Sequence, residues 1–139
     1  MNKVDFINSM VGVQYINRGY SLDGCDCFGL VYLYYKHVNG FDINLSDEYL
    51  NYENFLTSFT AQLAEWEEVD QPKDGDCCFV CFYGGLPTHC GIMISKNEVL
   101  HSRGDPNTNT GQVLVWKLRV LKRAIGVDVK YYRPKVNHA

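Results

Sequence analysis

The spacing of apolar residues predicts helices in the first half of the chain. Between residues 26 and 38, apolar side chains recur at three- and four-residue steps, and Asn39-Gly40 supplies a C-terminal stop. A shorter helix is predicted over residues 4–10, followed by an irregular, glycine-containing loop over residues 11–26. Ser46 can cap a further helix that runs to about Trp66, with acidic residues in its first turn.

Beyond Pro72 the pattern changes to short apolar runs separated by turn residues. The predicted turns are Gly84-Gly85, residues 95–97, residues 103–107 and Gly111. Helices followed by strands are typical of an α+β fold, in which N-terminal helices pack on a C-terminal antiparallel sheet. The predicted strands cover residues 77–83, 89–94, 98–102, 112–118 and 127–133.

Length and composition suit one compact domain over residues 1–139. Of these residues 46% are hydrophobic and 21% charged, and no internal repeat or Pro/Ser-rich linker divides them. The net charge of −3 gives no support to nucleic-acid binding, and no apolar run approaches the roughly 18 residues that cross a bilayer. The N-terminus lacks an apolar signal segment, so we expect synthesis in a cytoplasm, with the six cysteines reduced. An oxidised set of cysteines is the alternative.

Cys27 is the first candidate for chemistry, because it opens the apolar run Asp26-Cys27-Phe28-Gly29-Leu30-Val31. In the first turn of the predicted helix, unpaired N–H groups and the positive dipole end stabilise a thiolate and can hold an oxyanion. A cysteine placed there, with histidines on later strands, is typical of a thiol nucleophile and its base. For Cys27 alone, the alternative is a small buried cysteine packed on the sheet.

His89 and His101 can meet only if the turn between their strands has a suitable length. A three-residue turn at Ser95-Lys96-Asn97 places His101 opposite Gly91, on the same face as His89 and diagonal to it. A two-residue turn at Lys96-Asn97 sends His101 to the other face. If the two histidines meet, one can act as base while the other holds its tautomer; the alternative is a structural or exposed role for each.

A zinc site is the competing chemistry. The candidate ligands are Cys77, Cys78, Cys81, His89 and Cys90. Strand alternation points Cys77 and Cys81 to one face and Cys78 to the other, whereas structural zinc uses well-separated pairs joined by tight turns. We therefore expect no metal, and we expect Cys77, Cys78 and Cys90 to fill apolar positions. Cys25, in a loop expected to be exposed, could pair with Cys27 on oxidation or be inert, and we favour the inert role.

Several motifs, in order along residues 12–134, resemble those of the NlpC-type family of cell-wall peptidases, small papain-like cysteine enzymes of bacteria and phages. Each motif is weak alone, but their order and spacing together are specific. The chain departs from the family at Gln14, where the family has proline, at Phe28, where it has a small serine, and at Lys73-Asp74. The motifs are Gly12-Val13-Gln14-Tyr15, Asp26-Cys27-Phe28-Gly29-Leu30-Val31, Pro72-Lys73-Asp74-Gly75-Asp76, His89-Cys90-Gly91-Ile92-Met93-Ile94, Val99-Leu100-His101-Ser102 and Tyr131-Tyr132-Arg133-Pro134.

This resemblance implies a role for each matching residue. Cys27 would be the nucleophile, His89 the base and His101 the polar residue that orients the base. Tyr15 would help frame the oxyanion site, although without the resemblance it would be interpreted as a core residue. The resemblance also favours the three-residue turn, and it implies neither a metal nor an organic cofactor.

Members of that family hydrolyse peptidoglycan stem peptides, commonly between D-γ-glutamate and a diamino acid, and the resemblance implies the same reaction here through an acyl-enzyme. A short domain without an export signal or wall-binding repeat is most similar to the tail-tip peptidases of long-tailed phages. That likeness implies synthesis in a bacterial cytoplasm, phage tail-tip proteins as partners, and action from the virion tail at the host wall. The alternatives are an antibacterial toxin delivered by a secretion machine, and a structural tail or adaptor protein whose site is unused.

Overall fold

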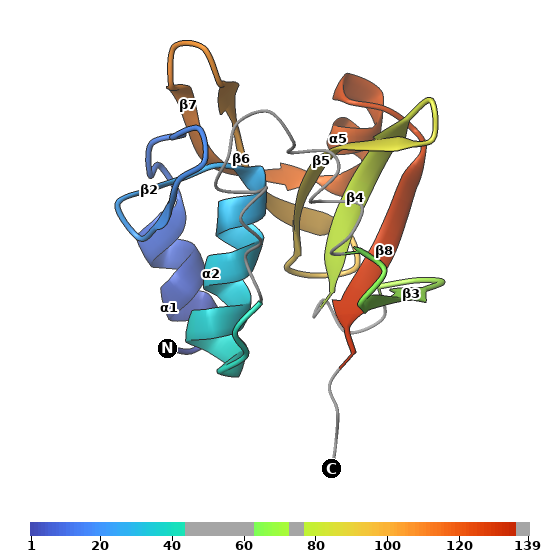
Figure 1. Ribbon diagram of the computed structural model, residues 1–139, viewed down its shortest axis with the longest axis horizontal. Coiled ribbons are helices and arrows are strands. Elements are labelled where there is room, and N and C mark those ends of the chain that lie inside the picture. Colours follow the sequence, from blue (N-terminus) through green and yellow to red (C-terminus); the bar gives the residue numbers. More distant parts are fainter. Residues whose placement is uncertain (44–62, 73–76, 136–139) are drawn as a thin grey trace.

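The computed structural model describes residues 1–43, 63–72 and 77–135. Within them, helices α1 (Lys3–Met10) and α2 (Cys27–Asn39) lie beside an antiparallel sheet, which confirms the predicted α+β fold (Figure 1). The helix predicted from Ser46 falls mainly outside the described residues. Its predicted end is wrong, because Trp66 begins a strand.

The main sheet has six strands in the order β3-β8-β4-β5-β6-β7, and every neighbouring pair is antiparallel. A separate two-stranded ribbon forms within the segment predicted to be an irregular loop. Its strands are β1 (Tyr20–Ser21) and β2 (Gly24–Cys25). The strands of the main sheet are β3 (Trp66–Val69), β4 (Cys78–Tyr83), β5 (Leu86–Met93), β6 (Glu98–Asp105), β7 (Thr110–Lys117) and β8 (Val129–Pro134).

Helix α2 begins and ends where its sequence predicts. The side chain of Asp26 caps its N-terminus, accepting a hydrogen bond from the Gly29 N–H at 2.7 Å. At the other end Gly40 adopts a left-handed conformation with φ of 65°, and its N–H bonds to the Tyr35 carbonyl. Cys27 is therefore the first residue of the helix, next to the capping carboxylate.

Both faces of the central strands are buried, which explains why β4 and β5 read as apolar runs. On one face, Cys78, Val80 and Cys90 belong to the core that also contains the buried side chains of α1 and α2. On the other face, Cys77 and Cys81 pack in a second core that includes Leu121. The alternation predicted for these cysteines is confirmed.

Two elements near the sheet differ from the sequence-based expectation. Helix α5 (Leu118–Ala124) follows β7 directly, so Leu118 begins a helix rather than ending a strand. Strands β6 and β7 extend into the predicted turn at residues 103–107, and Gly111 lies within β7 opposite Gly104. The long hairpin carries Arg103 on strand rather than turn backbone. Among the described residues, no helix is both long and apolar enough to cross a membrane.

Candidate active site

Cys27 lies at the N-terminus of α2 with only 8% of its surface exposed. A hydrogen bond from the Cys90 side chain, and then the hydrogen bond and charge of His89, hold the pKa of Cys27 well below its ordinary value. Burial acts in the opposite direction but does not cancel these contacts. Cys27 is therefore set up as a thiolate beside an imidazole. Cys90, expected only to fill an apolar position, also contacts the nucleophile.

His89 and His101 are in direct contact. His89 Nε2 lies 2.8 Å from His101 Nδ1, and the two rings are nearly perpendicular. Ile92 pairs with Leu100, and Met93 pairs with Val99. This register requires the three-residue turn at Ser95-Lys96-Asn97 rather than the two-residue turn. Since His89 Nε2 is engaged with His101, His89 Nδ1 remains for the Cys27 sulfur.

His101 is completely buried and packs on the indole of Trp116, with ring centroids 4.5 Å apart. Burial, then the charges of His89 and Arg103, lower the pKa of His101 to about 3, so its ring is neutral near pH 7. When His89 is an imidazolium, its Nε2–H must donate to an unprotonated His101 Nδ1. His101 then holds its own proton on Nε2, and it orients and stabilises the charged form of His89.

The buried, neutral His101 makes stability sensitive to acid. Its pKa is about 6.5 unfolded and about 3 folded, so the unfolded state binds more protons between these values. The contribution of neutral His101 to the free energy of unfolding is complete above pH 6.5 and is lost as the pH falls toward 3. Between pH 7 and pH 5 this group alone should remove about 2 kcal/mol from the free energy of unfolding. Urea titrations at both pH values should show a smaller acid-induced loss for His101→Gln; an equal loss would contradict a neutral His101.

A pocket of about 460 Å³ opens beside the nucleophile, and Tyr15, Cys27 and His89 line it together. Tyr15 is 8% exposed, and burial, then the charges of Cys27 and Asp26, raise its pKa, so its hydroxyl keeps its proton and can donate. Gly104 on β6 makes room for this ring, since a Cβ there would collide with Tyr15 Cγ. The structure thus brings together all four residues singled out from the sequence.

Phe28 follows the nucleophile, at the position where the family has a small serine. It does not line this pocket. It is buried in the core between α2 and the sheet, where it borders a small apolar cavity with Val31 and Trp66. The larger side chain thus modifies the packing of the helix on the sheet, leaving the pocket wall to other residues.

The remaining cysteines are buried thiols, and the expectation that Cys25 is exposed is wrong. The Cys25 carbonyl accepts a hydrogen bond from the Ser102 hydroxyl at 2.7 Å, and burial raises the pKa of the Cys25 thiol to about 12. Cys77 and Cys78 lie on opposite faces of the sheet. Across residues 1–43, 63–72 and 77–135, no group of three or more Cys, His, Asp or Glu side chains is placed to hold a metal.

Among the pocket residues that were not predicted from the sequence are two arginines, Arg18 and Arg103. Arg18 has a positive φ of 64°. Because residues other than glycine rarely adopt this conformation, the sequence gives no sign of it. Arg103 could have been found from the alternation of β6, because it lies two residues after His101 and so shares its face.

Comparisons with known proteins show the family and the fold of this chain. The family model described as the NlpC/P60 family matches residues 12–123. Among solved structures, the chain is similar to the NlpC/p60 domain of the peptidoglycan hydrolase SagA, with a TM-score of 0.60, 18% sequence identity and 95% of each chain covered. The chain has no detectable match among curated proteins.

Proposed function

Because the chain belongs to the NlpC/P60 family of cysteine hydrolases, we propose that it is an endopeptidase of peptidoglycan stem peptides that cleaves between D-γ-glutamate and a diamino acid. The observation that carries this proposal is the contact series from Cys27 to His89 to His101 beside a pocket large enough for a peptide segment. The similar SagA domain is part of a peptidoglycan hydrolase, which supports the choice of substrate class.

The reaction follows from the protonation states of these residues. The Cys27 thiolate attacks the scissile carbonyl carbon, and the charge that develops on the carbonyl oxygen is stabilised by the Cys27 backbone N–H and the Tyr15 hydroxyl. The His89 imidazolium then protonates the leaving amine, giving an acyl-enzyme and a neutral imidazole. Water, deprotonated by His89, attacks the thioester, and collapse of that intermediate releases the acid and restores the thiolate. His101 keeps His89 in the required orientation throughout.

Product analysis tests the proposed reaction. Purified sacculi and soluble stem peptides should be incubated with the protein or with Cys27→Ala, and the products identified by mass spectrometry. We expect a new diamino-acid amine terminus and a matching D-glutamyl acid only in the sample with Cys27. Products from another bond would overturn the specificity, and no cleavage of any wall chemistry would favour the alternative of an unused site.

We further propose that the protein acts from the tail of a phage virion, made in a bacterial cytoplasm and carried to the host cell wall by tail-tip partners. The support is the resemblance of these 139 residues, most of which one peptidase domain fills, to the short tail-tip members of the family. Purified phage particles should contain the protein in the tail fraction. Its absence from particles and from tail assembly, with activity in a competitor bacterium, would favour the delivered toxin.

A further inference from the structure

The pocket around Cys27 carries a positive charge that the proposed chemistry does not use. Arg18 and Arg103 both line it, and the carboxylate in the lining is that of Asp26. Asp26 is buried, and its two oxygens accept hydrogen bonds from the backbone N–H groups of Gly29 and Arg18. Asp26 thus helps to begin α2, while the guanidinium of Arg103 belongs to an exposed side chain at the pocket wall.

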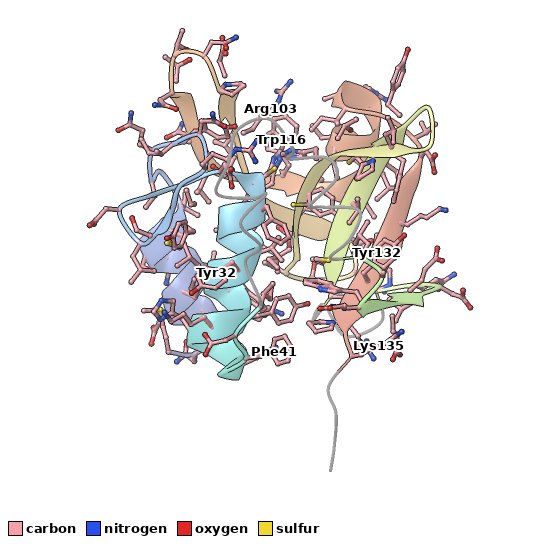
Figure 2. All side chains as sticks on the ribbon, viewed as in Figure 1. Tyr32, Phe41, Arg103, Trp116, Tyr132 and Lys135 are labelled. Atoms are coloured by element: carbon pink, nitrogen blue, oxygen red, sulfur yellow. The ribbon has the colours of Figure 1, made fainter. Side chains whose placement is uncertain are left out.

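Stacking on an aromatic ring holds the Arg103 side chain in place. Its guanidinium carbon lies 5.0 Å from the centroid of the Trp116 ring (Figure 2). The same indole also packs on His101. The same stack therefore fixes both the histidine pair and the arginine. The charge of Arg103 is also felt at the His101 ring, where it contributes to the lowered pKa of His101.

Arg18 brings a second guanidinium to the pocket through an unfavourable backbone conformation. Its φ of 64° costs about 1 kcal/mol or more for a residue with a side chain. The charge of Arg18 lowers the pKa of Tyr15, against the larger effects that raise it, which places this charge near the proposed oxyanion donor.

The proposed substrate carries an anion close to its scissile bond. A D-glutamate linked through its γ-carbonyl keeps a free α-carboxylate, with three carbons between the carboxylate carbon and the scissile carbonyl carbon. An arginine can bind such a carboxylate through two parallel hydrogen bonds. Resting on the proposed function, we propose that Arg103, aided by the charge of Arg18, binds the α-carboxylate of the D-glutamyl residue on the acyl side of the scissile bond.

Alkylation of Cys27 tests the anion site without requiring peptide hydrolysis. Rates with iodoacetate, an anion, and with iodoacetamide, its neutral analogue, should be measured by peptide mapping for the unmodified protein and for Arg103→Gln. Because both reagents attack the same sulfur, their ratio cancels any change in the thiolate population. The iodoacetate-to-iodoacetamide ratio should fall about threefold in Arg103→Gln, as expected for loss of one nearby charge. An unchanged ratio would overturn the proposal.

Two further variants separate charge from packing. Arg103→Lys keeps the charge and should retain most of the ratio. Arg119→Gln removes an arginine from the surface of helix α5, outside the pocket, and should leave the ratio unchanged. A fall in Arg119→Gln as large as in Arg103→Gln would show a general charge effect and would overturn a local site.

Stem peptides then identify the carboxylate. With a D-glutamyl peptide, Arg103→Gln should lower kcat/KM about tenfold or more, the usual consequence of losing a hydrogen bond to a charged group. With the α-amidated D-isoglutaminyl peptide, the same substitution should change kcat/KM less than twofold. Equal losses on both peptides would overturn the assignment. If the protein cleaves neither peptide while the alkylation ratio still depends on Arg103, the D-glutamyl assignment fails with the proposed function, and the anion site itself stands.

Discussion

Replacing His89 by glutamine should lower the rate of stem-peptide hydrolysis by about a thousandfold, because the same side chain protonates the leaving amine and then activates water. It should also move the pH midpoint for Cys27 alkylation upward, since the hydrogen bond and charge of His89 help to lower the pKa of Cys27. Glutamine keeps hydrogen-bonding capacity and approximate size but carries no titratable proton. Steady-state hydrolysis and the pH dependence of alkylation measure the two effects.

The matched control is His37→Gln, a histidine near the end of α2 that does not line the pocket. Substitutions away from buried or catalytic features usually change stability by about 0.5 kcal/mol or less, and this one should leave both hydrolysis and alkylation unchanged. If His89→Gln retained more than a tenth of the hydrolytic rate, His89 would not be the acid and base of this reaction.

Replacing Gly29 by alanine should lower the free energy of unfolding by about 3 kcal/mol. A Cβ at this position would collide with the Gly19 carbonyl oxygen and lie 3.2 Å from Asp26 Oδ1. The partner of the collision is backbone, so relief requires moving either the approach loop or the first turn of α2. This cost outweighs the roughly 1 kcal/mol by which alanine favours a helix over glycine. Urea unfolding measures the change.

Lys36→Ala, at an exposed position of the same helix, serves as the control for helix propensity and should change stability by about 0.5 kcal/mol or less. If Gly29→Ala were as stable as this control, the loop would not be held against the helix as described. The contact matters for the site because the loop carries Tyr15 and Arg18, and the helix carries Cys27.

Local patterns were enough to predict the parts of the site that depend on one element or one hairpin. The cap and apolar period of residues 26–38 placed Cys27 at the start of a helix, as observed. Strand alternation and the family resemblance together placed His89 and His101 on one face, and the register of β5 and β6 confirms this. Both inferences rest on interactions between near neighbours in the sequence.

Features that depend on distant segments were missed. Strand β3 is short and polar, and it exists because it pairs with β8 near the C-terminus. Cys25 lies in the core, and its carbonyl accepts a hydrogen bond from Ser102 of β6, which is 77 residues away in the sequence. For helix α5 a signal was present, since Leu118, Leu121 and Ile125 recur at helical spacing, but its first residue was interpreted as the end of β7.

The central claim is that Cys27 is a thiolate nucleophile, and the most direct measurement is the pH dependence of its alkylation by iodoacetamide, with peptide mapping of all six cysteines. Cys27 should react selectively at neutral pH with a midpoint well below 9, because its pKa is lowered while burial raises the pKa of Cys25 and Cys81 to about 12. A Cys27 midpoint near 9, or labelling spread over several cysteines at neutral pH, would contradict the claim.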